Sequence, residues 1–99
     1  MIKIKVTEKN ISILGHANYD DYGKDIICAA VSSIVICSIE AISQFDINAV
    51  EIKQTKDKLE IIINKTDDTT QKLITNMLNC LKELEKKYPK NIKIIDKEE

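Results

Sequence analysis

The sequence is poor in the residues that mark several common kinds of site. Of its 99 residues, two are glycine, one is proline, one is phenylalanine and one is histidine, and tryptophan is absent. There is no glycine-rich phosphate loop, so the common nucleotide-binding motifs are excluded. Cys28, Cys37 and Cys80 form no CxxC pair, and with one histidine the chain lacks the usual ligand set for zinc. We expect no metal and no cofactor, and reduced thiols in a cytoplasmic protein.

The chain also lacks an excess of charge of either sign. Fifteen basic and 16 acidic residues leave a formal charge of -1. A broad nucleic-acid-binding surface needs a basic face, so we expect no direct nucleic-acid binding, although the balance leaves a small local site open. No secretory signal is visible, and the most hydrophobic run, Ile26–Ile39, is shorter than the ~20 residues of a membrane span. We therefore expect no membrane association.

Hydrophobic periodicity predicts a single α+β domain over residues 1–99. Alternating apolar residues predict five strands, the first four as two hairpins, at residues 2–6, 11–14, 50–53, 59–63 and 92–95. Two helices are expected. The first covers about 26–43 and is apolar almost all round, and the second is amphipathic, has Asp68 as its cap and ends at Pro89. The predicted order is ββαββαβ with a mostly antiparallel sheet.

The first predicted helix needs cover on two sides because it is apolar on all of them. The sheet would supply one side. The second helix or a partner subunit would supply the other.

The only histidine, His16, stands twelve residues before Cys28. An imidazole and a thiol are sufficient for cysteine-type nucleophilic catalysis. Residues 16–24 show no hydrophobic period and should form a loop, in which Gly15 and Gly23 can act as hinges. This stretch is the candidate site that the residues alone suggest.

The start of the first helix decides whether Cys28 can be reactive. If Asp25 is the N-cap, Cys28 is the third helical residue, beside unpaired backbone N–H groups and the positive end of the helix dipole. Both stabilise a thiolate, and the same N–H groups can hold an oxyanion. The alternative is ordinary: a lone cysteine on an apolar helix is usually a small buried hydrophobe, and a lone histidine near a turn is usually a surface residue.

The other cysteines serve as internal comparisons. Cys37 lies about 180° round the helix from Cys28, so it should face the opposite side in a structural role. Cys80 lies one residue off the apolar stripe of the second helix, where packing is the expected role. Ser32 lies one turn from Cys28 on the same face, either bonded to a backbone carbonyl or supporting the site.

Three short runs together resemble the signature of the ribosomal-processing cysteine protease family of low-GC bacteria. They are Gly-His-Ala at 15–17, Gly-x-Asp at 23–25 and Cys-Ala-Ala-Val-Ser at 28–32, with the same spacing between histidine and cysteine. The resemblance implies a small homodimeric cysteine endopeptidase. Such enzymes remove the N-terminal extension of large-subunit ribosomal protein number twenty-seven, after a short segment with bulky hydrophobic residues. The family's substrate is therefore the precursor of that protein.

The resemblance also implies roles for individual residues. Cys28 would be the nucleophile and His16 its general base, with supporting roles for Gly15, Asp25 and Ser32. The resemblance does not extend to the loop residues 18–22. From the acyl-transfer mechanism itself we expect a substrate loop that opens for an extended peptide and closes over it, comprising Ala17, Asn18, Tyr19, Asp20, Asp21, Tyr22 and Gly23.

Asp20 and Asp21 either contact basic residues of a ribosomal substrate or belong to a solvated loop. Two other functions of the whole chain also stay open. The whole chain could instead be a non-catalytic ribosome-associated or RNA-binding assembly module, although its sheet has few aromatic residues and its charge is -1. A small-molecule regulatory domain is the other rival, since α+β folds of this size often bind effectors.

Overall fold

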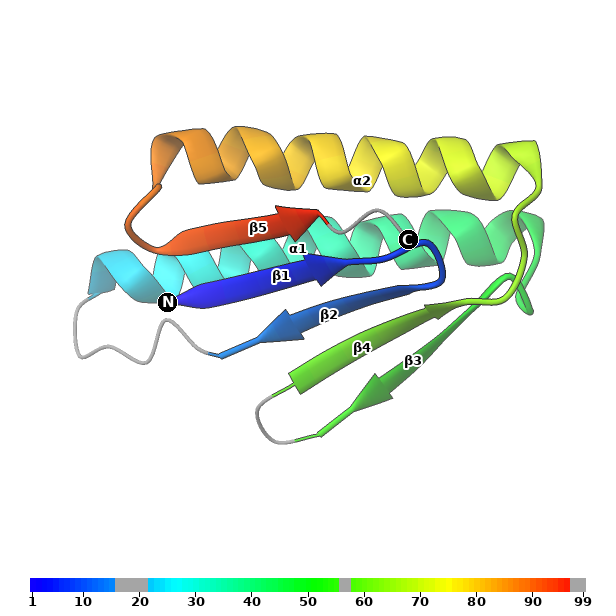
Figure 1. Cartoon of the computed structure of the whole chain (residues 1–99), viewed down its shortest axis with the longest axis horizontal. Coiled ribbons are helices and arrows are strands. Elements are labelled where there is room, and N and C mark those ends of the chain that lie inside the picture. The colour runs from blue at the N-terminus through cyan, green and yellow to red at the C-terminus, as the bar shows by residue number, and fades with distance from the viewer. Residues whose placement is uncertain (16–21, 56–57, 97–99) are drawn as a thin grey trace.

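Five strands form one sheet, and two helices pack against it (Figure 1). The computed structural model describes residues 1–15, 22–55 and 58–96, with the backbone alone for residues 22–25. The chain order confirms the predicted ββαββαβ. The elements are β1 (Ile2–Val6), β2 (Asn10–Leu14), α1 (Tyr22–Phe45), β3 (Val50–Gln54), β4 (Lys58–Ile63), α2 (Asp68–Lys87) and β5 (Ile92–Asp96).

The sheet has the strand order β3-β4-β2-β1-β5. Both predicted hairpins are present, as the antiparallel pairs β1–β2 and β3–β4. The antiparallel pair β2–β4 joins the two hairpins, and only β5 pairs in parallel, with β1. The prediction of a mostly antiparallel sheet is therefore confirmed.

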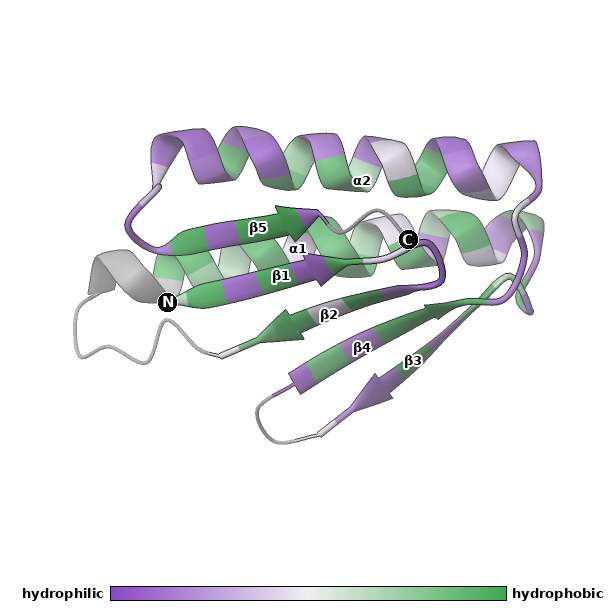
Figure 2. Cartoon of the chain, in the orientation of Figure 1, coloured by the Kyte–Doolittle hydropathy of each residue, from purple (hydrophilic) through white to green (hydrophobic). Residues whose placement is uncertain are grey.

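The core lies between the sheet and the two helices. Alternate strand residues face the helices, and hydrophobic and hydrophilic residues alternate along β1 (Figure 2). Each fully buried Ile, Leu or Met side chain contributes about 1.5–3 kcal/mol through removal from water. The largest fully buried side chains are those of Ile4, Ile11, Ile42, Ile61, Met77, Leu81, Ile92 and Val35.

Helix α1 starts earlier than predicted. It begins at Tyr22, so Asp25 lies inside its first turn instead of capping it, and Gly23 is helical. Of the three residues before Asp25, only Gly23 disfavours a helix, and one glycine costs a helix only about 1 kcal/mol. The helix can therefore extend through them. Cys28 is consequently the seventh helical residue. In a regular helix its N–H is satisfied by the carbonyl four residues earlier, so the predicted free N–H groups beside the sulfur are not there.

Helix α2 begins one residue before the predicted position. Its cap is Asp67, not Asp68, because Asp67 has the extended backbone of a cap (φ -65°, ψ 163°). The Thr70 backbone N–H donates to Asp67 Oδ2 at 3.3 Å, and the Thr70 hydroxyl donates to Asp67 Oδ1 at 2.8 Å. These hydrogen bonds lower the pKa of the Asp67 carboxyl. Asp68 is exposed and pairs instead with Lys72 at 3.2 Å.

Helix α1 is only partly covered. By length and composition alone, Ile26–Phe45 could cross a membrane (mean hydropathy 2.2), a test that core helices also pass. Here the helix packs against the sheet and α2 through Ile27, Val31 and Val35. Ile26 and Ile36 nevertheless remain 64% and 56% exposed, so a strip of apolar surface stays open to solvent.

Candidate active site

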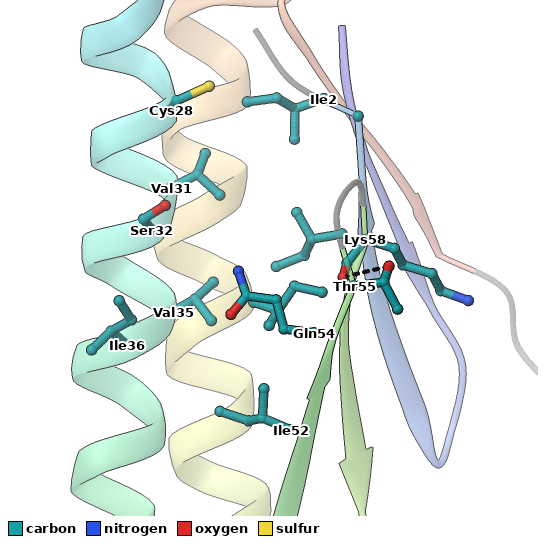
Figure 3. Close-up of a pocket in the computed structure, with 13 residues that line it drawn as sticks. Ile2, Cys28, Val31, Ser32, Val35, Ile36, Ile52, Gln54, Thr55 and Lys58 are labelled. Atoms are coloured by element: carbon teal, nitrogen blue, oxygen red, sulfur yellow. Dashed lines mark hydrogen bonds between the residues drawn. The ribbon is translucent and has the colours of Figure 1, made fainter. Parts of the chain in front are cut away.

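A cavity of about 270 Å³ lies between the N-terminal half of α1 and the sheet (Figure 3). One wall comes from α1 and the other from β3, β4 and the ends of β1 and β2. The lining is mainly aliphatic with a few polar groups at its rim. The residues are Ile2, Ile13, Gly15, Cys28, Val31, Ser32, Val35, Ile36, Ile52, Gln54, Thr55, Lys58 and Leu59.

Cys28 reaches this cavity from α1. Its side chain is half-buried and packs against the edge of the core, and its sulfur points toward Ile2 (Figure 3). Ser32 lies one helical turn further on and lines the same cavity, as its spacing predicts. The thiol is thus accessible from the cavity while its backbone is held by a rigid helix.

Gly15 brings the end of β2 to the same cavity. Its φ of +84° lies in the left-handed region that other residues rarely adopt, and an added Cβ would lie 2.7 Å from the Met1 carbonyl oxygen. Only glycine fits this position without strain. Gly15 therefore sets the direction in which the chain leaves β2, immediately before His16 in the sequence.

Several predicted site residues lie outside the described part of the chain. They are His16, Ala17, Asn18, Tyr19, Asp20 and Asp21. Tyr22, Gly23 and Asp25 are described only as backbone of α1, which shortens the predicted loop at its C-terminal end. The structure thus brings together Gly15, Cys28 and Ser32 among the predicted residues.

Cys37 and Cys80 do not line the cavity. Cys37 lies nine positions after Cys28 on α1, so it faces the opposite side as predicted, but within this chain it is exposed and does not pack against the core. Cys80 is also exposed, because its position beside the apolar stripe of α2 faces solvent. The expected packing role of Cys80 is therefore wrong. All three cysteines lie among the described residues, and none forms a disulfide.

The part of the β3–β4 hairpin in the site was not predicted from the sequence. Ile52, Gln54 and Thr55 form the wall opposite α1, and the Thr55 N–H donates to the Lys58 carbonyl oxygen at 2.8 Å to close the turn. Ile52 has the register of a core residue yet is 45% exposed, because the cavity separates it from α1. Such long-range proximity has no local signal. Among the described residues, no group of His, Cys, Asp and Glu could hold a metal ion.

The family model for "Cysteine protease Prp" matches residues 1–93. The chain belongs to the cysteine protease Prp family. A ribosomal processing cysteine protease Prp from Staphylococcus aureus is 30% identical over 93 residues, which cover 91% of this chain and 86% of the relative. The Mycoplasma pneumoniae Prp is 31% identical over 99 residues, covering 97% and 95%. The chain is accordingly a cysteine protease.

Solved Prp structures have the same fold. The S. aureus protease with a covalently linked product peptide matches with a TM-score of 0.86, 26% identity and coverage of 98% of this chain and 100% of that one. The same protease with a substrate peptide gives a TM-score of 0.88 at equal identity and coverage. The α+β architecture is therefore that of the Prp family.

Proposed function

We propose that this protease removes the N-terminal extension of large-subunit ribosomal protein number twenty-seven during ribosome maturation. Cys28 acts as the nucleophile and His16 as the general base. The observation that carries the proposal is the half-buried Cys28 thiol in a cavity whose wall includes Gly15, the residue bonded to His16. The relatives named as ribosomal processing proteases support the substrate class.

The proposed chemistry is acyl transfer. A thiolate on Cys28 attacks the scissile carbonyl carbon, and the imidazolium of His16 then protonates the leaving amine as the C–N bond breaks. Water, deprotonated by His16, hydrolyses the thioester and restores the thiol. Because Cys28 lies in the helix interior, the backbone N–H groups next to it are already hydrogen-bonded within the helix. We therefore expect the oxyanion donors to come from other groups of the site. Asp25 and Ser32 remain supporting positions, with Ser32 on the cavity wall.

The cavity suits side chains of an extended peptide better than a whole effector molecule. Its volume of about 270 Å³ lies near the lower end of the roughly 300–1,000 Å³ of ordinary small-molecule sites. Val31, Val35 and Leu59 give it an aliphatic interior. We infer that it accepts the bulky hydrophobic residues before the cleavage point, while the loop over residues 17–21 closes above the peptide and Asp20 and Asp21 meet its basic residues.

Single substitutions test the catalytic assignment. Cys28→Ala and His16→Ala should each abolish cleavage of a peptide that spans the extension junction, with circular dichroism unchanged. Ser32→Ala should cause a modest loss. Cys37→Ala and Cys80→Ala are matched controls, since both thiols are exposed and lie outside the cavity. Full activity of the Cys28→Ala protein would refute the mechanism.

We further propose that the enzyme is a cytoplasmic homodimer. The support for dimerisation is a strip on α1 at helical spacing, comprising Ile26, Ala29, Ser33 and Ile36, all exposed. Exposed apolar surface of this kind is typical of an interaction site. In sedimentation velocity, Ile26→Glu should shift the protein toward monomer. Ile47→Glu is the control, because Ile47 is 76% exposed and lies beyond α1. A wild-type protein that sediments as a monomer would contradict the proposal.

A further inference from the structure

The two edges of the sheet differ in whether their backbone groups are covered. At the β5 edge, the Ile94 N–H donates to Glu85 Oε2 of α2 at 2.9 Å. Such cover prevents another strand from adding there. At the β3 edge, Glu51, Ile52, Lys53 and Gln54 are all exposed. Within the described part of the chain, the β3 edge is therefore the one available for a further strand.

The hydrogen bonds of the β3–β4 hairpin determine which groups of β3 point outward. The Thr55 N–H donates to the Lys58 carbonyl, and the Asn64 N–H donates to the Ala49 carbonyl, each at 2.8 Å. In an antiparallel pair, residues alternate between bonding to the partner strand and pointing their N–H and C=O away from it. These two bonds set the alternation from the two ends of the hairpin. By this alternation Ile52 and Gln54 direct their backbone N–H and C=O groups away from β4.

The same two residues line the cavity that contains Cys28. Their side chains point toward α1, while Cys28 lies at the far end of the cavity (Figure 3). The side chains of the edge strand and the Cys28 thiol thus line one cavity, beside the strand's outward backbone groups. An extended peptide placed here would meet backbone partners and side-chain space together.

We propose that the edge of β3 binds the substrate as an added strand, with hydrogen bonds to the backbone of Ile52 and Gln54. The proposal rests on the proposed function, and it assigns the backbone part of substrate recognition to this hairpin. In strand addition, main-chain hydrogen bonds give affinity and pockets for alternate side chains give specificity. Alternate substrate side chains then enter the cavity, and the scissile bond lies toward Cys28.

Proline at Gln54 removes one outward N–H. An edge strand tolerates proline where the N–H faces solvent, so the β3–β4 ladder is kept. The experiment measures the anisotropy of a fluorescein-labelled peptide spanning the extension junction, bound to the Cys28→Ala protein. Adding Gln54→Pro should raise the Kd about 3- to 10-fold above that of Gln54→Ala, the usual effect of one hydrogen bond. Lys53→Ala is the control, since Lys53 bonds toward β4.

A second measurement uses the peptide. N-methylation at successive positions before the cleavage point should weaken binding at alternate residues, because only every second N–H of an added strand meets β3. Equal Kd values for the Pro and Ala variants, uniform N-methyl effects, or no binding to the Cys28→Ala protein would overturn the proposal. These measurements need no cleavage, so their failure would not affect the role of Cys28 as nucleophile. That role is tested separately by the cleavage assay of the Cys28→Ala protein.

Discussion

Replacing Gly15 with alanine tests whether the end of β2 controls both stability and catalysis. At φ +84° an L-residue in the left-handed region costs about 1–2 kcal/mol. The new Cβ would also lie 2.7 Å from the Met1 carbonyl oxygen, a backbone atom that must shift. Met1 precedes Ile2, which is buried in the core, so this shift has little room. We expect a total loss of about 2–3 kcal/mol, within the usual range for strained positions.

The loss should be visible in a thermal melt. For a domain of this size, about 2–3 kcal/mol lowers Tm by roughly 10–20 °C. At a temperature where the variant is still folded, its kcat/KM for the junction peptide should be at least about tenfold lower than that of wild type. The reason is that Gly15 directly precedes His16, and small misplacements of a catalytic residue are costly.

Gly23→Ala is the matched control. Gly23 lies within α1, where alanine is favoured over glycine by about 0.5–1 kcal/mol, so Tm should stay constant or rise. A Gly15→Ala protein whose Tm lies within about 2 °C of wild type would have lost well under 1 kcal/mol and would refute the reasoning.

Two further predictions concern the helices. Asp67→Ala should destabilise α2 more than Asp68→Ala in urea unfolding, because Asp67 accepts both Thr70 hydrogen bonds. Those bonds hold the folded pKa of Asp67 below its ordinary value of 3.8, so the stabilisation is present above that pH and is lost as pH falls through the lower folded value. A stability difference between wild type and Asp67→Ala that is as large at pH 2 as at pH 7 would contradict this. Glu85→Ala should lower the free energy of unfolding by about 1–3 kcal/mol, because it leaves the Ile94 N–H without its carboxylate partner. The uncovered β5 edge should also increase association between molecules, which light scattering measures.

The helix starts show how far local patterns reach. Asp67 and Asp68 are neighbours with the same side chain, and only backbone geometry makes Asp67 the cap. Asp25 has the residue type of a cap, but α1 runs through it from Tyr22. Capping preferences therefore located each helix start to within one to four residues and did not select the first residue.

The cysteines show a second limit. Helical spacing correctly separated Cys28 from Cys37, because both lie on one rigid helix. It could not tell that Cys37 and Cys80 would be exposed, since exposure depends on what packs against each helix. Likewise the hairpins followed from alternation and short turns. The pairing of β5 with β1 joins segments about 90 positions apart, so it carries no local signal.

The sequence by itself determined the element order, the amphipathic faces and the motif around His16 and Cys28, because these depend on periodicity and on residues close together in the chain. Only the tertiary structure decided that Gly15 takes a left-handed conformation against Met1, and that Ile52 and Gln54 form the wall opposite Cys28. Both depend on the strand order and on how α1 lies over the sheet. Those follow from the packing of the whole core, which no short segment encodes.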